Sequence, residues 1–184
     1  MNFGSVSFYP VYLTIGNITK AERRKDDSYM LLGYLPELQG TDAEKKEWGK
    51  SGLKLRLLHE CLREILKAIV SKGTSGALIS DPTGTERLVF PLFAYYAADW
   101  PEGKKITMTR DTKMTAEPCH ACHIPKARLG EISPDIRKME MKSVTKMRAI
   151  FDQAMELINT PKKKGEGRAL LARYSLQEYA VSNS

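Results

Sequence analysis

The sequence is poor in cysteine and lacks a long apolar run. Its three cysteines, Cys61, Cys119 and Cys122, are odd in number and lack the spacing of a disulfide framework, and the amino end does not resemble a signal peptide. The longest apolar run, 88–98, is interrupted by Pro91 and is well short of the roughly 20 residues that a membrane-spanning helix needs. These features predict a protein of a reducing compartment, nuclear or cytoplasmic, with no membrane partner.

Signals for small-molecule chemistry are also missing. The segment 73–76, Gly-Thr-Ser-Gly, lacks the lysine and the helix context of a phosphate-binding loop, so no small-molecule substrate is evident. A nucleophilic enzyme built on Cys119 and His123 lacks an acid to orient the histidine, and sequence neighbours do not normally reach the required geometry. We therefore expect neither a nucleotide-binding protein nor a cysteine-dependent enzyme.

Positive charge is unevenly distributed along the 184 residues. Lys and Arg number 29 against 22 Asp and Glu, which gives a formal charge of +7. Residues 1–100 contain 13 basic and 12 acidic side chains, whereas residues 101–184 contain 16 and 10. This excess favours a polyanionic partner for the second half, because each Lys or Arg that meets a phosphate releases condensed counterions. A basic surface exposed only to solvent is the alternative.

The first half shows clear strand and helix patterns. Residues 7–15 and 28–35 are rich in β-branched and aromatic residues and predict two antiparallel strands, with a helical turn over 20–25 capped by Thr19. Apolar residues at steps of three and four then predict one long amphipathic helix that ends near Gly73. Its buried stripe consists of Leu55, Leu58, Leu62, Ile65 and Ile69.

The patterns after residue 76 are more mixed. The turn 81–84 predicts a hairpin of 77–80 with 87–90, and the apolar segment 92–98 predicts a buried strand in preference to a buried helix. We expect 103–118 to be irregular apart from a short strand at 106–109. Two helices are then predicted, one from Ser133-Pro134 to Ile158 with Val144 on its buried side, and one over 168–179. An α+β or mixed α/β fold follows, with 1–184 forming a single domain or fragment.

Four separated blocks of the chain carry a family resemblance. The first is Tyr9 to Ile18 with the sequence YPVYLTIGNI, which is followed by Arg23-Arg24. The others are 30–36, 89–102, and the run from Cys119-His120-Ala121-Cys122 to Leu129-Gly130. In this order they resemble the central region of Plavaka-type transposases, the fungal relatives of the CACTA elements. The resemblance extends over most of the chain.

The resemblance implies an architecture and an activity. It implies a truncated ribonuclease-H-like core lacking its first strand in 1–100, an irregular cysteine-containing insertion in 101–132, and a basic helical segment in 133–184. The family's DDE chemistry is DNA cleavage and strand transfer by an Asp, Asp, Glu set that holds two Mg²⁺ ions. Asp99 matches the second aspartate. A turn-capping aspartate is the alternative interpretation of Asp99.

The rest of the catalytic set has no match in this sequence. The first aspartate is expected on a strand upstream of Phe8, where no acidic residue occurs, and the glutamate belongs to a region after Ser184. One carboxylate cannot hold two metal ions. We therefore interpret the chain as an internal fragment or relic of a transposase that is catalytically incompetent alone. The alternative is a non-catalytic module that binds nucleic acid or protein.

The cysteine pair is a candidate zinc site. The two-residue gap between Cys119 and Cys122 allows both sulfurs to reach one tetrahedral Zn²⁺ ion, and His123 is a candidate third ligand. A second cysteine pair at a set distance, which strong zinc signals show, is missing. A redox or structural loop is the alternative.

Basic residues form three clusters with DNA as the partner that the resemblance implies. Contacts from such groups to phosphates bind without reading sequence. The candidates are Lys104, Lys105, Arg110 and Lys113 in the first cluster, Arg137, Lys138, Lys142, Lys146 and Arg148 in the second, and Lys162, Lys163 and Lys164 in the third. The aromatic residues Tyr95, Tyr96 and Trp100 are expected to pack in the core in preference to stacking on bases.

Overall fold

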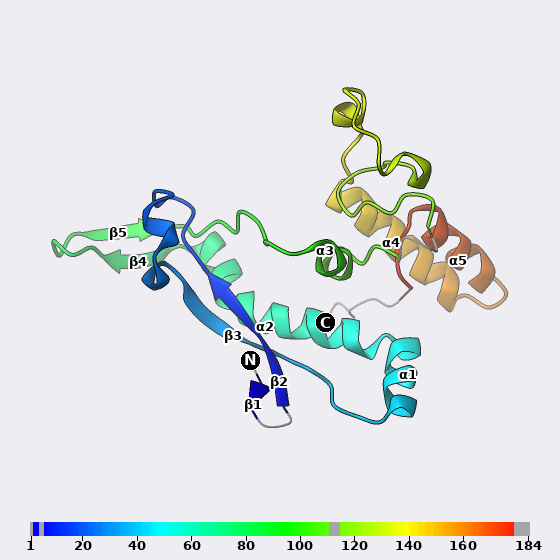
Figure 1. Cartoon of the computed structure of the whole chain (residues 1–184), viewed down its shortest axis with the longest axis horizontal. Coiled ribbons are helices and arrows are strands. Elements are labelled where there is room, and N and C mark those ends of the chain that lie inside the picture. Colours follow the sequence, from blue (N-terminus) through cyan, green and yellow to red (C-terminus); the bar gives the residue numbers. More distant parts are fainter. Residues whose placement is uncertain (1, 4–5, 111–114, 179–184) are drawn as a thin grey trace. The chain divides into compact units, whose positions relative to one another are not determined.

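The computed structural model describes residues 2–3, 6–110 and 115–178, and the chain divides into two compact units, Met1–Tyr96 and Ala97–Ser184. The described residues form five α-helices and two small antiparallel sheets (Figure 1). This confirms the mixed α and β class predicted from sequence. Within the same residues, no helix is both long enough and apolar enough to span a membrane.

A three-stranded sheet opens the first unit. Its strands are β1 (Asn2–Phe3), β2 (Val6–Leu13) and β3 (Met30–Pro36), with β2 in the middle. Strands β2 and β3 pair antiparallel from Phe8 opposite Pro36 to Leu13 opposite Met30, and the register shifts between Val11 and Tyr12. The predicted pair of antiparallel strands is confirmed.

The turn between β2 and β3 is held by its own side chains. Thr19 Oγ1 accepts a hydrogen bond from the Glu22 N–H at 3.2 Å, at the start of the 3₁₀ helix η1 (Glu22–Arg24). The Arg23 guanidinium donates to the carbonyl oxygens of Gly16 at 2.6 Å and Ile18 at 3.1 Å. The predicted helical turn is confirmed, and Arg23 serves the turn itself. A second 3₁₀ helix, η2 (Asp26–Ser28), leads into β3.

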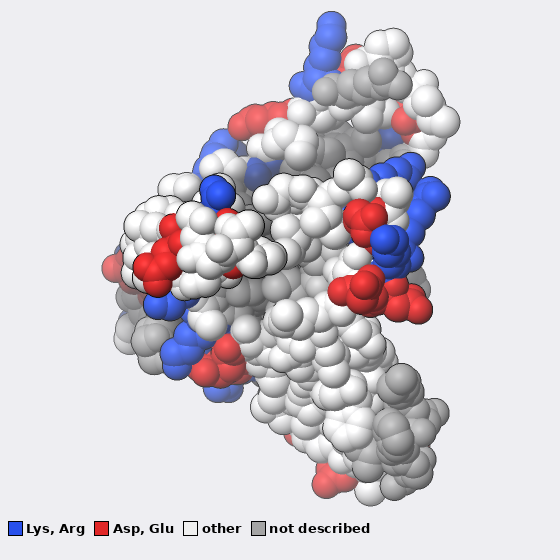
Figure 2. All heavy atoms as spheres, turned by 90° about the vertical axis from the view of Figure 1, so that its left-hand side faces the viewer, with Lys and Arg blue, Asp and Glu red and all other residues white. Residues whose placement is uncertain are grey.

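Helix α2 (Leu53–Ser75) packs against β3 through the predicted apolar stripe. Leu62 is buried, and a Cβ placed on Gly33 of β3 would lie 3.4 Å from Ile65. Since Gly33 faces α2, Tyr34 lies on the opposite face of the sheet, where its ring meets Phe8 edge-on at 5.8 Å. Neither β2 nor β3 contains a charged residue, and Figure 2 shows a broad uncharged area on one face of the molecule.

Helix α1 (Asp42–Ser51) precedes α2 and is not predicted by the apolar pattern. A capping box starts it, in which Thr41 Oγ1 accepts from the Glu44 N–H and the Glu44 carboxylate accepts from the Thr41 N–H. Gly52, with a φ of 69°, turns the chain from α1 into α2.

A hairpin ends the regular structure of the first unit. It joins β4 (Ala77–Ser80) to β5 (Glu86–Val89), with Leu78 opposite Leu88. The Asp81 carboxylate accepts from the Thr83 and Thr85 N–H groups, as the turn chemistry predicts. The predicted hairpin is confirmed.

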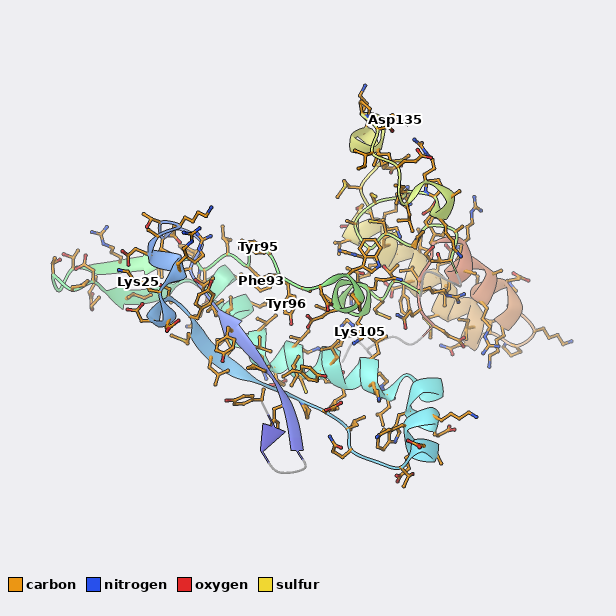
Figure 3. The ribbon with its side chains drawn as sticks, in the orientation of Figure 1. Lys25, Phe93, Tyr95, Tyr96, Lys105 and Asp135 are labelled. Atoms are coloured by element: carbon orange, nitrogen blue, oxygen red, sulfur yellow. The ribbon has the colours of Figure 1, made fainter. Side chains whose placement is uncertain are left out.

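The prediction of a buried strand over 92–98 is wrong. The segment between β5 and α3 has no regular secondary structure, and Leu92 is 85% exposed and Tyr95 68% exposed (Figure 3). No described strand pairs with this segment, so its apolar side chains have no sheet to pack on. Core packing of Tyr95 is therefore also wrong, whereas Tyr96 is half-buried.

The core of the second unit lies between α4 (Val144–Asn159) and α5 (Lys164–Arg173). Ala154 and Leu171 are fully buried there, together with Leu176. Gly167 permits the close approach of the two helices, because a Cβ at this position would lie 2.5 Å from the carbonyl oxygen of Ala154. The shorter elements of this unit are α3 (Trp100–Ile106), η4 (Lys126–Arg128) and η5 (Ile136–Lys138).

Three predicted boundaries in this unit are wrong. Helix α4 begins at Val144, which is 83% exposed, and not at Ser133, because Ser143 caps it and 133–143 forms turns and a β-bridge. Helix α5 covers 164–173 and not 168–179; Tyr179 lies outside the described residues. Part of the expected irregular segment is the helix α3, and the expected strand at 106–109 is a single bridge of Thr109 to Leu176.

Candidate functional site

The cysteine loop of the second unit is fixed by backbone pairing to the segment that precedes α4. Cys122 and Met141 form an antiparallel bridge. The His123 N–H donates to the Glu140 carbonyl at 3.0 Å, and the Lys142 N–H donates to the Ala121 carbonyl at 2.8 Å. The loop therefore has a defined backbone although it contains no regular helix or strand.

Both cysteines of the loop are half-buried. The Ala121 N–H donates to Cys119 Sγ at 3.4 Å. Burial raises the pKa of the Cys122 thiol, and the neighbouring Cys119 raises this pKa further. Lys142 acts in the opposite direction.

Lys142 belongs to the framework of the loop. Its ammonium donates to the carbonyl oxygens of Glu117 at 3.2 Å and Cys119 at 2.7 Å. Burial lowers the pKa of Lys142, and electrostatic interactions with Glu117 and with both cysteines oppose this shift. This role differs from the phosphate contact expected of Lys142, since the ammonium is engaged by the protein.

The histidines of the loop have other contacts. His123 Nδ1 lies 2.7 Å from Glu117 Oε2, and the His123 side chain is 17% exposed. The His120 ring meets the Trp100 ring edge-on at 5.2 Å, and its Nδ1 is buried without a hydrogen-bond partner in the described part of the chain. Sequence reasoning missed Glu117, which precedes His123 by six residues and carries no local signal.

The residues of the loop do not fit a complete zinc site. In the described ranges, no three His, Cys, Asp or Glu side chains stand together as a metal-binding group. A structural zinc site needs four ligands, and this loop contains two cysteines. The Nδ1 atom of His123, the expected third ligand, lies 2.7 Å from Glu117 Oε2, a contact that a metal-binding histidine can also make.

Asp99 caps a helix. Its Oδ1 accepts a hydrogen bond from the Glu102 N–H at 2.8 Å, and its backbone is extended, as expected at an N-cap. Asp99 is exposed and follows the irregular segment 92–98 instead of a buried strand. The described carboxylates do not fit a two-magnesium centre, because none joins Asp99 in a metal-binding group.

Two residues of the first basic cluster, Lys104 and Arg110, are engaged in contacts within the protein. Lys104 is 8% exposed, so its side chain lies largely inside the second unit. The Arg110 guanidinium donates to the carbonyl oxygen of Leu176 at 2.6 Å. Lys105 is exposed on α3 (Figure 3), and Lys113 lies outside the described residues.

The residues of the second basic cluster differ in their surroundings. Lys138 is exposed on η5, and Arg148 is exposed on α4. Lys146 lies 3.7 Å from Glu140, a weak surface ion pair. The side chain of Arg137 lies outside the described part of the structure.

The third basic cluster forms the turn between α4 and α5. Lys162, Lys163 and Lys164 are exposed, and none of them forms an ion pair with another described residue. Lys162 adopts a left-handed φ of 67°, which reverses the chain between the helices. Three consecutive ammonium groups thus stand at one end of a packed helical hairpin.

Comparison with known proteins gives one match. A family model described as Plavaka transposase matches residues 1–176. No curated protein and no solved structure matches the chain.

Proposed function

The chain belongs to the Plavaka transposase family, and on this premise we propose that it is a transposase relic that contacts DNA without cutting it. The family match confirms the resemblance predicted from sequence. Its parent chemistry would act on DNA, so we expect a nuclear site of action. The first unit would correspond to a ribonuclease-H-like core, an assignment supported by the order of β2, β3 and α2.

The geometry around Asp99 supports the absence of catalysis. In-line phosphoryl displacement by two metals needs several carboxylates that converge on one site. Asp99 instead accepts a hydrogen bond from the backbone of α3, and among the described residues it belongs to no group of three or more His, Cys, Asp or Glu side chains that could hold a metal. We therefore expect no nicking or joining of DNA by this chain, with or without Mg²⁺.

The lysine turn is the observation that carries the proposed DNA contact. Exposed ammonium groups without ion-pair partners can exchange water and counterions for phosphate oxygens at low cost. Lys162, Lys163 and Lys164 satisfy this condition, whereas Lys104 and Lys142 are engaged within the protein. The α4–α5 core holds the turn in place. Such contacts position DNA without reading its sequence.

A triple substitution of Lys162, Lys163 and Lys164 by Gln tests this interface. Affinity for a labelled DNA duplex is measured by fluorescence anisotropy over a series of salt concentrations. Each lost phosphate contact should reduce the slope of log K against log salt by about 0.9, so the triple variant should lose up to about 2.7. Two duplexes of unrelated sequence should respond alike.

A second triple variant provides the matched control. Lys20, Lys45 and Lys46 are exposed in the first unit and form no ion pair with a described residue, so their substitution by Gln removes the same net charge. We expect this variant to retain most of the salt slope. Equal weakening by both variants, or binding that does not respond to salt, would contradict an interface at the turn.

A self-sufficient binding module, the alternative from the sequence, would use the same lysines. It differs in its thermodynamics, because such a module melts cooperatively and binds DNA with a reproducible site size. A fragment of a larger enzyme should show broad unfolding and weak binding without a fixed site size. Calorimetry combined with titration of duplexes of increasing length separates these two cases.

A further inference from the structure

Two hydroxyl side chains of the second unit directly precede a proline. They are Ser133, before Pro134, and Thr160, before Pro161. Proline-directed protein kinases select a hydroxyl residue in this position, and many of them also prefer a basic side chain three residues after the acceptor. Lys163 occupies that position after Thr160, whereas an isoleucine occupies it after Ser133. The sequence around Thr160 is therefore the better match to such a kinase.

Thr160 lies where the chain leaves the helical path at the end of α4. Its backbone is extended, with a φ of −84° and a ψ of 129°, as expected of a residue before proline. Thr160 is half-buried, and the following residues of the turn, from Pro161 to Lys164, are exposed. The Thr160 hydroxyl donates to the Glu156 carbonyl at 2.8 Å. One exposed hydrogen bond must therefore open before this hydroxyl can react.

The turn between α4 and α5 brings Thr160 close to the three lysines (Figure 1). The Lys163 N–H donates to the Thr160 carbonyl at 3.2 Å, and Lys162 has a φ of 67°. With Pro161 between them, these features define a type II β-turn, whose first and fourth α-carbons lie within about 7 Å of each other. A phosphate on Thr160 would therefore be within reach of the flexible lysine side chains.

The surroundings of Ser133 oppose a further negative charge. Its hydroxyl donates to a carboxylate oxygen of Asp135, so a phosphate there would meet a like charge at close range. Arg128, the nearby cation, donates to Asp135 at 2.6 Å and to Glu131 at 2.8 Å, so two carboxylates already neutralise it. The two hydroxyl groups thus differ in their electrostatic surroundings, and Ser133 provides an internal control for Thr160.

We propose that Thr160 is a phosphorylation site, modified by a proline-directed protein kinase with ATP, and that the phosphate weakens the DNA contact of the lysine turn. A phosphate ester carries a charge of about −1.5 to −2 at pH 7 and three strong acceptor oxygens. It offsets up to about two of the three lysine charges and hydrogen-bonds to ammonium groups that would otherwise contact DNA. The effect on DNA rests on the proposed function, whereas the modification itself does not.

The modification is a phosphoryl transfer from ATP. A carboxylate of the kinase accepts the Thr160 hydroxyl proton, and Oγ1 attacks the γ-phosphorus of the Mg²⁺-bound nucleotide. The bond from this phosphorus to the β,γ-bridging oxygen breaks as the new bond to Oγ1 forms, and ADP leaves. The hydrogen bond to Glu156 is lost, because the ester oxygen has no proton to donate. The carboxyl end of α4 disfavours negative charge, so the lysine side chains are the favourable partners of the phosphate.

Phosphorylation of the full chain tests the site. The protein is incubated with ATP and a purified proline-directed kinase of the cyclin-dependent class, and the modified residues are assigned by mass spectrometry of proteolytic fragments. Thr160 should be modified several-fold faster than Ser133, and Ser133→Ala should leave the Thr160 rate unchanged. Lys163→Gln should slow modification several-fold, with Lys162→Gln as its matched control. No phosphate on Thr160, or equal rates at Thr160 and Ser133, would overturn the proposal.

DNA binding by the phosphorylated protein tests the effect of the modification. In fluorescence anisotropy, the slope of log K against log salt should fall by up to about 1.8, which is about 0.9 for each of two offset contacts. If the triple lysine variant loses slope but the phosphorylated protein does not, the regulation is overturned and the DNA contact stands. If the triple variant keeps the parent slope, the DNA contact is refuted, and with it this effect of the phosphate.

Two substitutions of similar size at Thr160 separate charge from structure. Thr160→Asp and Thr160→Asn both remove the hydroxyl that donates to Glu156, but only aspartate adds a negative charge. Thr160→Asp should lower the salt slope by about 0.9, and Thr160→Asn should keep the slope of the parent protein. Equal slopes in the two variants would overturn the electrostatic effect.

Discussion

Gly167 is the position where a single methyl group should most clearly weaken the second unit. A Cβ added there would lie 2.5 Å from the Ala154 carbonyl oxygen, 2.7 Å from Ile158 Cγ1 and 2.9 Å from the Ile158 amide nitrogen. Two of these three atoms belong to the α4 backbone, so rotation of a side chain cannot remove the overlap. Substitution by alanine must therefore separate α4 from α5 and disturb the packing of Ala154 against Leu171.

The expected magnitude of Gly167→Ala follows from two opposing effects. Overpacking of a well-packed core costs about 1–3 kcal/mol, and contact with backbone atoms places this site near about 3 kcal/mol. The better helix propensity of alanine returns about 1 kcal/mol. The free energy of unfolding should thus fall by about 2 kcal/mol, and the melting temperature by roughly 4–8 °C for each kcal/mol in a unit of this size.

Gly165 supplies a matched control on the same helix. No atom lies within 4 Å of a Cβ placed there, so Gly165→Ala changes propensity without overpacking and should stabilise by at most about 1 kcal/mol. Unfolding in urea is followed by the fluorescence of Trp100 in a Trp48→Phe background, because Trp100 belongs to the second unit. A Gly167→Ala variant as stable as its parent would refute the described packing of α4 on α5.

Two further predictions concern carboxylates of the second unit. Asp99→Ala should lower its stability by about 1 kcal/mol in urea denaturation while Asp99→Asn retains most of it, because asparagine also caps helices well; equal losses would argue against capping. The pKa of Asp135 is lowered from 3.8 to about 2, first by the Ser133 hydroxyl and then by Arg128 (Figure 3). Since the folded-state pKa is the lower one, the stabilisation is present above about pH 4 and lost as the pH falls towards 2. Asp135→Asn should therefore lower the urea midpoint at pH 7 but not at pH 2; a pH-independent difference would contradict this.

Elements specified by local pattern were predictable from the sequence. The apolar stripe of α2 repeats every three or four residues, and the Asp81 side chain bonds the backbone of its own turn. Both elements can therefore be predicted without knowing which distant residues they contact. Helix α1 was missed although its capping box, Thr41 to Glu44, is readable in the sequence. The apolar-pattern search passed over it because 42–51 has little amphipathic character.

The structure of the cysteine loop depends on residues that are distant in sequence. The spacing of Cys119 and Cys122 predicts the loop, whose backbone pairs with the segment before α4 through the bridge of Cys122 to Met141. The position of Lys142 depends on the pairing of Met141 with Cys122, which joins segments about twenty residues apart in sequence. The same pairing draws 133–143 away from a helical path, so the start signal at Ser133 was overridden by a distant contact.

The segment 92–98 shows that a run of apolar residues is not necessarily buried. A run of apolar residues becomes a buried strand only if a neighbouring strand pairs its backbone and a second layer covers its side chains. In the described structure Leu92 and Tyr95 have neither, whereas the stripe of α2 has β3 to pack on. The structural argument for Asp99 as a metal ligand depended on its standing at the end of such a strand. Without that strand, the case for metal binding by Asp99 rests on the family match alone, and the hydrogen bond to Glu102 gives Asp99 a sufficient structural role.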